Sequence, residues 1–516
     1  MMRMSEAAAM LNVPFTGADA EVLRVSTDSR NTQPGDLFIA LRGAKFDGGL
    51  YAAQALQQGA VGVVLDADQA PDVLHALRVP DTRLALGQLA AGWRNRFTIP
   101  IVAITGSNGK TTVKEMLAAI LRVAVGEGAS AEPKSRPYPN PLQSGLAQPQ
   151  PPLPRGEGGV RAKGEGANAE PTPNRPHPNP PPEGEGANAK PKAIDAVLAT
   201  EGNFNNDIGL PLMLLRLRDT HRYAVLEMGM NHLGEIDYLT RLARPDVALI
   251  NNAQAAHVGM LGSVTEIARA KCEIYNGLDA QGIAIVNADD AHVGMWREAN
   301  VGRRIVSFGL DQDANVRGEY QSDDQGSTLR VLTVSERFEV RLQVPGTHNV
   351  RNALAACTAA LALNIAPNHI CAGLAGFTGV KGRLQKKPGR HGSTFIDDSY
   401  NANPDSVLAA LKVLSLHAGP KILVLGDMGE LGEQAVALHA QIGLAARQAG
   451  IDRLFALGDL TRETVNAFGP GATHFDRIET LLADLEKALS ANSTVLVKGS
   501  RFMHMERVVQ NFTEAR

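Results

Sequence analysis

Residues Ile101–Thr112 read IVAITGSNGKTT, and this stretch decides the fold of the chain. Its first part, Ile101–Ile104, is a β-branched apolar run typical of a buried strand. The turn Gly106-Ser107-Asn108-Gly109 then breaks the run, and a helix can begin at Lys110. Glycines let backbone N–H groups surround an anion, a helix N-terminus favours negative charge, and a lysine reaches terminal phosphates. The order of strand, glycine turn and helix therefore predicts a binding site for a nucleoside triphosphate.

The loop is shorter than the usual phosphate-loop pattern. That pattern has a glycine five residues before the Gly-Lys pair, and Ile104 occupies this place here. Thr111 and Thr112 follow the lysine, and either hydroxyl can coordinate Mg²⁺. An ordinary glycine turn is the alternative, but a strand and a helix flank this loop as phosphate binding requires. We therefore expect ATP and Mg²⁺ as cofactors, bound by residues 106–112.

Length and composition restrict the class of protein. The chain has 516 residues, which at roughly 150 residues per domain suggests about three domains. A net charge of −3 gives no broad basic surface, so we expect no nucleic acid partner. No apolar run approaches the ~20 residues that span a bilayer, and the start MMRMSEAAAM lacks a signal-peptide core. Cys272, Cys357 and Cys371 are scattered without a C-x-x-C, which argues against disulfides and structural zinc and for a cytoplasmic protein.

The chain divides into three α/β segments. Residues 1–98 alternate short strands and helices, and residues 99–381 repeat this alternation on a larger scale, which predicts a mainly parallel sheet around the phosphate loop. Within the second segment, residues 314–344 alternate polar and apolar positions as antiparallel hairpins do. Residues 382–516 form a third, Rossmann-like unit. Its GDMGELG run (426–432) lacks the spacing and the acidic partner of a dinucleotide site.

Residues 124–192 differ from the rest in composition. GEGASAEP, GEGANAEP and GEGANAKP repeat there, and large apolar residues are almost missing. Such a segment cannot bury enough surface to offset its ordering entropy, so we expect a disordered Pro/Gly-rich insertion. It serves either as an inert surface insertion or as an arm that binds a partner.

Three residues of the central segment are candidates for metal or phosphate contact. Glu227 ends the strand Tyr223–Met228, where a carboxylate beside a phosphate loop is placed to hold Mg²⁺; a surface charge is the alternative. His257 follows the strand Val247–Ile250, and a lone histidine is more often structural than a ligand. Lys271 lies in an amphipathic helix, where a lysine normally faces solvent.

Several amides are candidates for substrate contact. Asn203, Asn205 and Asn206 lie in a glycine-bearing loop, where they either bind a polar substrate or satisfy a turn. Asn349 and Asn352 lie one turn apart at a predicted helix start, where they either read a base edge or cap the helix.

A further set lies at the junction of the second and third segments. Arg383 follows Gly382 at this junction, and Asp397 and Asp398 end a predicted strand. An arginine and paired carboxylates at a domain cleft suit contacts to phosphate and ribose, with surface turn chemistry as the alternative.

Taken together, these segments resemble the Mur ligase family, specifically its members that add D-alanyl-D-alanine to UDP-N-acetylmuramoyl-tripeptide. The resemblance covers nearly the whole chain except 124–192. It rests on STDSR with PGDLFIALRG (26–43), TGSNGKTT (105–112), TEGNFNNDIGLP (200–211), VLEMGMNHLGEI (225–236), AHVGMLGS (256–263), AKCEI (270–274), GTHNVRNALAA (346–356), DDSYNANPDS (397–406), GDMGELG (426–432) and VLVKGSR (495–501).

The resemblance implies three domains and an ATP-dependent ligase of peptidoglycan precursor synthesis. The reaction would pass through an acyl phosphate, and the protein is expected to be a monomer. It implies catalytic roles for Lys110, Glu227, His257, Lys271 and Arg383. Metal ligands would be Thr111, Glu227, His257 and Lys271, the lysine after carbamylation. Asn349 and Asn352 match adenine-side residues, and Arg383 and Asp398 match phosphate and ribose contacts. Substrate residues would be Ser29 and Arg30 for the UDP-sugar end, with Asn203, Asn206, Asn401 and Asn403.

Two features depart from the family pattern, and rival activities remain. Gly49 stands where relatives often carry histidine. The insertion 124–192 interrupts what is in the family a direct connection between the phosphate-loop helix and the next strand, which would alter substrate access near residues 200–206. A sister ligase that adds a single amino acid is the nearest rival, but its DNPR motif is replaced here by NANP at 401–404. Folylpolyglutamate synthase is a further rival because it shares the ATPase core, but it lacks an N-terminal unit of the type found here at residues 26–43. A nucleotide-binding regulatory protein without catalysis is the alternative from another class.

Overall fold

The computed structural model describes residues 1–43, 46–69, 73, 75–126, 195–255, 258–323 and 326–513. Residues 127–194 lie outside the described residues, and with them most of the predicted insertion. His257 also lies outside them. The helix after the phosphate loop runs to Gly126, so the start of the segment 124–192 still belongs to a helix. Within the described ranges, no helix is long and apolar enough to cross a membrane.

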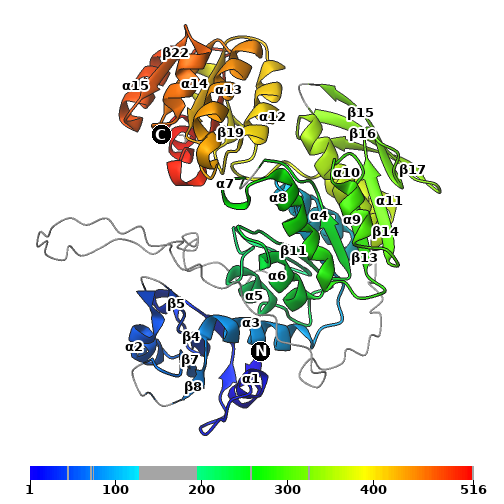
Figure 1. Ribbon diagram of the computed structural model, residues 1–516, viewed down its shortest axis with the longest axis vertical. Helices are drawn as coiled ribbons and strands as arrows, with labels where there is room; N and C mark the ends of the chain where they lie inside the picture. The colour runs from blue at the N-terminus through cyan, green and yellow to red at the C-terminus, as the bar shows by residue number, and fades with distance from the viewer. Residues whose placement is uncertain are drawn as a thin grey trace, which may run out of the picture.

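The N-terminal domain is built on a small parallel sheet of order β3-β4-β7-β8 (Figure 1). These strands are β3 (Arg24–Ser26), β4 (Asp36–Ile39), β7 (Gly62–Asp66) and β8 (Ala76–Val79). Around them lie β1 (Met2–Arg3), α1 (Met4–Leu11), β2 (Glu21–Val22), η1 (Ser29–Asn31), β5 (Arg42–Gly43), β6 (Phe46–Asp47), η2 (Gly48–Tyr51), α2 (Ala52–Gln57) and α3 (Thr82–Arg94).

The central domain contains a nine-stranded sheet of order β10-β11-β9-β12-β13-β14-β15-β16-β17. The strands are β9 (Ile101–Thr105), β10 (Val197–Ala199), β11 (Tyr223–Glu227), β12 (Val247–Ile250), β13 (Ile283–Asn287), β14 (Arg304–Gly309), β15 (Val316–Asp323), β16 (Gly326–Leu332) and β17 (Arg337–Leu342). Pairing is parallel from β10 to β15 and antiparallel from β15 to β17, which confirms the predicted parallel sheet with attached hairpins.

Helices cover this sheet and connect its parallel strands. They are α4 (Lys110–Gly126), α5 (Gly209–Leu214), α6 (Glu235–Ala243), α7 (Val258–Leu261), α8 (Val264–Cys272), η3 (Glu273–Gly277), α9 (Val293–Glu298), α10 (Thr347–Ala362) and α11 (Pro367–Ala375). Helix α4 begins at Lys110, the residue that the sequence predicts.

The order of the central strands positions the site. Strand β9 is fully buried and lies between β11 and β12, with parallel pairing on both sides. Because the carboxyl ends of parallel strands meet at one edge of a sheet, the loops after β9, β11 and β12 are neighbours there. The phosphate loop, the Glu227 carboxylate and the segment after Ile250 are therefore brought together by the sheet itself.

The C-terminal domain has a six-stranded sheet of order β18-β19-β23-β20-β21-β22, parallel except for β18. Its strands are β18 (Gln385–Pro388), β19 (Thr394–Asp398), β20 (Lys421–Gly426), β21 (Arg453–Leu457), β22 (Ala472–Phe475) and β23 (Thr494–Lys498). Its helices are η4 (Arg390–Gly392), α12 (Pro404–Ser415), η5 (Gly432–Gln434), α13 (Ala435–Gln448), α14 (Thr461–Phe468), α15 (Ile478–Ala488), η6 (Arg501–Met503) and α16 (Glu506–Thr513).

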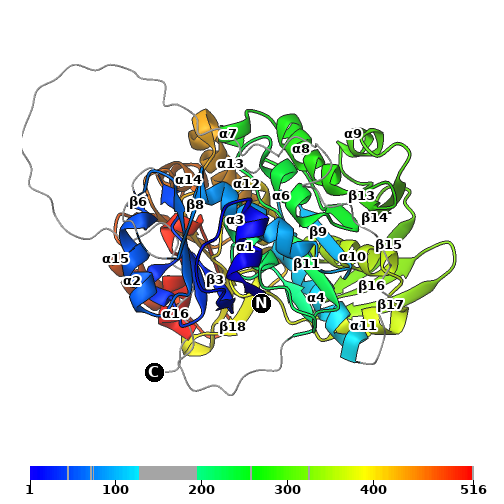
Figure 2. The same ribbon diagram turned by 90° about the horizontal axis from the view of Figure 1, so that it is seen from below.

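Helix α3 joins the N-terminal domain to the central domain. Its buried residues share one hydrophobic core with residues of α5 and α6; Figure 1 shows α3 next to both helices, and Figure 2 shows it next to α6. The Trp93 indole N–H donates to the Leu217 carbonyl at 3.1 Å, and Arg94 Nε donates to the Ala243 carbonyl at 3.0 Å. The C-terminal domain instead has two cores of its own. We keep 1–98, 99–381 and 382–516 as proposed domain limits. The boundary at residue 98 comes after α3, so α3 is counted in the N-terminal domain although it shares a core with the central domain.

Candidate active site

The phosphate loop has a backbone shape that only glycine accepts at one position. Gly109 has φ +80°, and an added Cβ would lie 2.2 Å from Asn352 Oδ1 and 2.7 Å from Asn251 Nδ2. Lys110 follows as the first residue of α4, and its Nζ donates to the Gly106 carbonyl at 2.7 Å. Desolvation lowers the pKa of Lys110; Glu227 opposes this shift and Arg383 adds to it. The lysine therefore folds over its own loop, in electrostatic contact with both residues.

Glu227 lies against this loop as the sequence predicts. It is 3% exposed at the end of β11, which excludes the alternative of a surface charge. Its Oε2 accepts a hydrogen bond from Thr111 Oγ1 at 2.9 Å, and its Oε1 accepts one from Asn205 Nδ2 at 2.8 Å. Its backbone N–H donates to Thr200 Oγ1 at 2.9 Å. Of the two hydroxyls considered for Mg²⁺, it is Thr111 that meets this carboxylate.

Arg383 reaches the same hydroxyl from the other domain. Its Nη2 donates to Thr111 Oγ1 at 3.1 Å, and its guanidinium carbon lies 4.4 Å from the centre of the Tyr400 ring. Residues from the phosphate loop, β11 and the C-terminal domain thus meet at Thr111. Such a meeting of hydroxyl, carboxylate and guanidinium suits a γ-phosphate and its counter-ion.

Lys271 is buried, although the sequence pattern of its helix predicts a solvent-exposed lysine. The amphipathic pattern of α8 indicates a solvated lysine, but Lys271 is 2% exposed in the last turn. Burial, together with the nearby Lys110, lowers the pKa of Lys271 well below its usual value. An amine that loses its proton easily can react with carbon dioxide, because only the neutral amine is nucleophilic. Burial is therefore consistent with the carbamylation that the resemblance implies.

Of the four predicted Mg²⁺ ligands, two are in direct contact with each other in the structure. Thr111 and Glu227 are hydrogen-bonded to each other. Lys271 lies close enough to Lys110 for the charge of Lys110 to lower the pKa of Lys271, and His257 lies outside the described residues. Within the described ranges, His, Cys, Asp and Glu form no group of three that could hold a metal by themselves. Mg²⁺ commonly binds through one or two carboxylates and the phosphates of its substrate, so Thr111 and Glu227 fit an ion that arrives with ATP.

An amide network around Asn108 links the phosphate loop to its neighbours. The Asn108 backbone N–H donates to Asn252 Oδ1 at 2.9 Å, and its side chain donates to Gln254 Oε1 at 2.7 Å. The Asn251 amide donates at 2.9 Å both to the Asn108 carbonyl and to Asn352 Oδ1. The run NNAQ directly follows β12, so the rule that polar residues gather at strand ends could have identified these residues.

Asn349 and Asn352 are both buried in the first turns of α10, and neither caps it. Gly346 is the N-cap residue, and the Asn349 amide donates to the Pro345 carbonyl at 2.8 Å. Helix capping is therefore wrong as their interpretation, and contact with adenine stays a prediction.

Asp398 is buried at the end of β19, so surface turn chemistry is also wrong there. Lys498 Nζ donates to Asp398 Oδ2 at 2.5 Å and to the Asn401 carbonyl at 3.0 Å. Burial raises the pKa of Asp398, and Lys498 and Arg383 oppose this shift. Lys498 belongs to the motif VLVKGSR, but it was not among the predicted site residues.

The remaining amides take structural positions. Asn206 Oδ1 accepts from the Gly209 N–H at 2.8 Å, and Asn203 accepts from the Asn205 N–H through its carbonyl at 2.7 Å. Asn403 caps α12 and also donates to Asn108 Oδ1 at 2.9 Å, so it connects the two domains. Asn401 accepts from the Ala402 N–H at 2.9 Å through its side chain.

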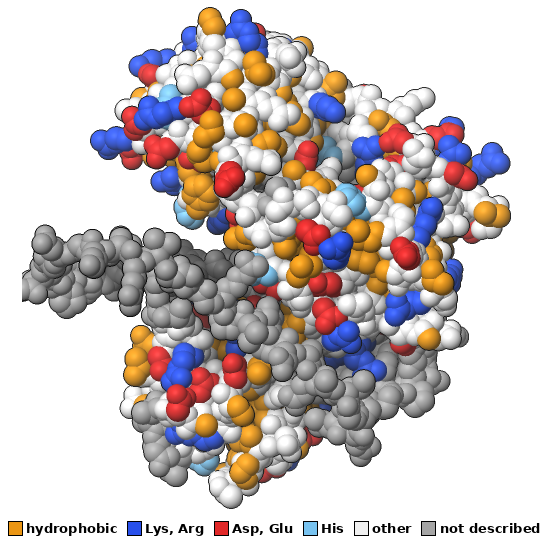
Figure 3. Space-filling model, in the orientation of Figure 1, with side chains coloured by type: hydrophobic (Ala, Val, Ile, Leu, Met, Phe, Trp, Pro, Cys, Tyr) orange, Lys and Arg blue, Asp and Glu red, His pale blue; other side chains and the backbone are white. Residues whose placement is uncertain are grey.

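Ser29 and Arg30 lie away from this cluster, in η1 of the N-terminal domain. Arg30 Nη2 pairs with Asp28 Oδ2 at 2.7 Å on an exposed surface. Figure 3 shows a notch at the left of the molecule where the C-terminal domain meets the central domain.

The glycine-rich loop 426–432 contacts the central domain. The Gly259 N–H of α7 donates to the Glu430 carbonyl at 3.1 Å, and an added Cβ on Gly259 would lie 2.7 Å from the Gly432 nitrogen. This loop therefore acts as a close contact between domains.

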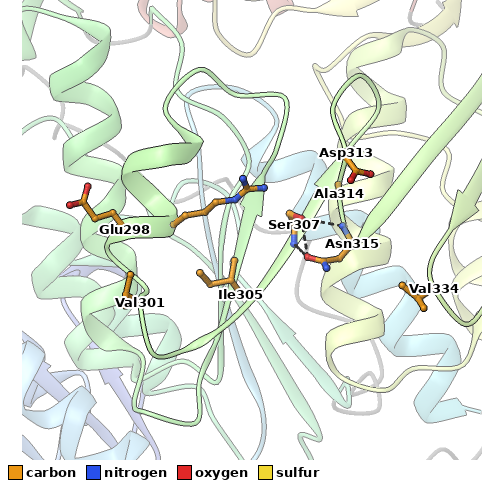
Figure 4. Close-up of a pocket in the computed structure, with 9 residues that line it drawn as sticks. Glu298, Val301, Ile305, Ser307, Asp313, Ala314, Asn315 and Val334 are labelled. Atoms are coloured by element: carbon orange, nitrogen blue, oxygen red, sulfur yellow. Dashed lines mark hydrogen bonds between the residues drawn. The ribbon is translucent and has the colours of Figure 1, made fainter.

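A surface pocket lies elsewhere, along α9, β14 and the following turn (Figure 4). Ser307 and Asn315 are hydrogen-bonded there, with Ser307 Oγ and Asn315 Oδ1 2.9 Å apart. None of its lining residues is a predicted site residue. The lining consists of Arg297, Glu298, Val301, Ile305, Ser307, Asp313, Ala314, Asn315 and Val334.

His348 carries a prediction about pH. Its ring is partly buried in the first turn of α10, with Nε2 shielded from solvent, and desolvation, with smaller contributions from Lys498 and Arg351, lowers its pKa to about 4 from 6.5. A lowered pKa means that the folded state favours neutral His348 more than the unfolded state does. The free energy of unfolding is therefore highest above pH 6.5 and decreases as the pH falls toward 4 and the unfolded state takes up a proton. Between pH 7.5 and 5 the loss should be about 2 kcal/mol.

Denaturation by urea at pH 7.5 and pH 5.0 checks this prediction. The free energy of unfolding should fall by less in His348→Gln than in the wild-type protein, because the titrating group is gone. Thr347→Val, at the neighbouring residue of the same helix turn, removes no group that titrates between pH 5.0 and 7.5, so this control should keep the wild-type difference. Equal losses in wild-type and His348→Gln would contradict the assignment.

Comparison with known proteins agrees with this geometry. Three family models match the chain: the Mur ligase family catalytic domain at 21–94, the Mur ligase middle domain at 104–146 and 187–360, and the Mur ligase glutamate ligase domain at 382–501. The UDP-N-acetylmuramoyl-tripeptide–D-alanyl-D-alanine ligase of Escherichia coli K12 is 36% identical, over 99% of this chain and 98% of that protein. The enzyme of the same name from Haemophilus influenzae is 34% identical, over 96% and 94%.

Solved structures give the same result. A crystal structure of MurF from Acinetobacter baumannii has a TM-score of 0.80 and 32% identity, and the match covers 100% of this chain and 99% of that one. MurF from Thermotoga maritima in complex with ADP shares the fold at 23% identity, with a TM-score of 0.74 and coverage of 94% and 96%. The chain belongs to the Mur ligase family.

Proposed function

We propose that the residues around Thr111 carry out an ATP-dependent ligation that joins D-alanyl-D-alanine to UDP-N-acetylmuramoyl-tripeptide. The chain is an ADP-forming acid–amino-acid ligase of peptidoglycan precursor synthesis. The observation that carries the assignment of the site is the contact of Thr111 with both Glu227 and Arg383. Through this contact, the central and C-terminal domains meet at Thr111, the residue after the lysine proposed to bind phosphate.

The reaction needs ATP because a free carboxylate is a poor acyl donor. The terminal carboxylate of the tripeptide attacks the γ-phosphorus of ATP, the bond to the bridging oxygen breaks, and ADP leaves. The amine of D-alanyl-D-alanine then attacks the acyl phosphate, giving a tetrahedral intermediate that expels phosphate as the amide forms. The amine loses a proton in this step, and the products are ADP, phosphate and the lengthened peptide.

Charge neutralisation is the main task of the site. Several anionic oxygens crowd together during phosphoryl transfer, so preorganised cations lower the barrier. Lys110 would contact the terminal phosphates, and Arg383 would reach the γ-phosphate from the C-terminal domain. Thr111, Glu227 and carbamylated Lys271, with His257, would hold Mg²⁺. When bound, Mg²⁺ neutralises phosphate charge and orients the γ-phosphate.

The remaining predicted residues would bind the ends of the substrates. Asn349 and Asn352 would face adenine, and Asp398 would face the ribose. Ser29 and Arg30 would hold the UDP-sugar end, while Asn203 and Asn206 would face the peptide. Asn401 and Asn403 would lie near D-alanyl-D-alanine.

A phosphate-release assay separates this function from its rivals. With ATP and UDP-tripeptide, release should depend on D-alanyl-D-alanine, and single amino acids should support rates lower by on the order of 10²-fold. Lys110→Ala serves as the control for contaminating phosphatase. Equal rates with a single amino acid would indicate a sister ligase, and no release with any acceptor would indicate a nucleotide-binding regulatory protein.

A further inference from the structure

An ion pair connects the N-terminal domain to the loop beside the predicted metal carboxylate. Arg83 Nε donates a hydrogen bond to Asp207 Oδ2, and this bond raises the pKa of Arg83. The Arg83 side chain is 52% exposed, whereas that of Asp207 is 19% exposed. The N-cap residue Asp81 accepts from the Arg83 N–H at 2.7 Å, which fixes Arg83 in the first turn of α3. The pair therefore has a rigid support on its N-terminal side.

The loop that carries Asp207 closes tightly on itself. The Gly209 N–H donates to Asn206 Oδ1 at 2.8 Å, and the Leu210 N–H donates to the Asn206 carbonyl at 2.9 Å. A Cβ added to Gly209 would lie 2.3 Å from the Phe204 Cα, so the two ends of this turn are in backbone contact. A displacement of Asp207 would therefore move Phe204 and the adjacent Asn205, because the turn has no slack to absorb it.

Asn205 connects this loop to Glu227. Its carbonyl accepts from the Gly229 N–H at 2.8 Å, which ties it to the chain just after β11. Its side-chain amide donates to Glu227 Oε1 at 2.8 Å, while Thr111 donates to the other carboxylate oxygen at 2.9 Å. Each oxygen of Glu227 thus has its own donor, and Asn205 sets the rotation of the carboxylate. Partners of this kind strongly affect how well a ligand holds its metal.

We propose that Arg83 is a positioning residue for the ligation, which acts through Asp207 and Asn205 to orient Glu227 toward the metal-bound nucleotide. This inference rests on the metal role proposed above for Glu227. Its consequence is that the N-terminal domain, which would bind the UDP-sugar, also determines the geometry of the ATP side. Arg83 would then have a larger effect on magnesium dependence than on substrate affinity.

Magnesium titration at saturating ATP, UDP-tripeptide and D-alanyl-D-alanine tests the proposal. The Mg²⁺ concentration for half-maximal rate should rise roughly 3- to 10-fold in Arg83→Ala and in Asp207→Asn. The double variant should show no further increase, because both changes break the same contact. Arg83→Lys keeps the charge and should recover part of the loss. The exchanged pair, Arg83→Asp with Asp207→Arg, should bring the value back to within about twofold of wild type.

Arg96→Ala is the matched control. Arg96 is a similarly exposed arginine whose partner, Glu6, lies at 2.7 Å within the N-terminal domain, so its loss should leave magnesium dependence unchanged. Single Arg83 variants that raise only the KM for UDP-tripeptide would overturn the positioning role. Glu227→Gln separates the two hypotheses. If it leaves magnesium dependence unchanged, the metal role of Glu227 fails; if it shifts that dependence while the Arg83 variants do not, only the inference about Arg83 fails.

Discussion

Replacing Lys110 with alanine should lower kcat by about 10²- to 10³-fold, which is the cost of removing one preorganised charge from a phosphoryl-transfer site. Lys110 lies at the first position of α4, and its Nζ is held 2.7 Å from the Gly106 carbonyl. A bound triphosphate would take the place of that carbonyl as the stronger acceptor, because a charged oxygen attracts an ammonium group more than a neutral one does. Residues 106–112 contain no second lysine that could replace this contact.

Release of ADP and phosphate with saturating substrates measures this loss. Arg122→Ala is the matched control on the same helix, because Arg122 pairs with Asp195 at 2.6 Å on an exposed surface and should keep the wild-type rate. Lys110→Arg keeps the charge but not the compact ammonium group, so it should recover only part of the activity. Turnover of Lys110→Ala within about twofold of wild type would refute the role assigned to the loop.

Arg383→Ala should lower kcat by on the order of 10²-fold or more, by loss of an arginine that stabilises transferred phosphate charge. Arg383 donates to Thr111, and its guanidinium carbon lies 4.4 Å from the centre of the Tyr400 ring, so two contacts hold the guanidinium in place. Lysine has neither the planar fork of donors nor the same contact with an aromatic ring, and Arg383→Lys should therefore remain severely impaired. The KM for UDP-tripeptide should change little, because its UDP end is predicted to bind in the N-terminal domain.

Steady-state rates for each substrate check this separation of kcat from KM. Arg462→Ala, at an exposed arginine paired with Asp476 on the surface of the same domain, is the control and should behave as wild type. A large increase in the KM for UDP-tripeptide with unchanged kcat would place Arg383 on the substrate side instead.

Local patterns in the sequence were sufficient to predict the centre of the fold and part of the site. The run Ile101–Ile104, the glycine turn and Lys110 specify strand, loop and helix within a few residues, and β9 and α4 follow them closely. Glu227 was also predictable, because a buried parallel strand that ends in a carboxylate places that group at the edge where loops meet. These predictions need only the order of elements along the chain.

Other features depend on packing between distant segments, and local patterns could not reveal them. The sequence of α8 places Lys271 on a polar face, yet neighbouring elements cover that face and bury the lysine. Three asparagines in one loop look equivalent, but only the fold determines that Asn205 faces Glu227 while Asn206 stabilises its own turn. The amides of Asn251 and Asn252 become partners of Asn108 only because β12 lies beside β9.

The shared core of α3 has a consequence for building hybrid enzymes from relatives of this protein. Exchange of the C-terminal module near residue 382 would keep both of its own cores intact, so such hybrids should express and fold. A junction near residue 98 would instead separate Leu86, Leu89 and Trp93 from the central-domain residues with which they share a core. Transplanting the first module alone should give poorly soluble protein unless α5 and α6 are transferred with it.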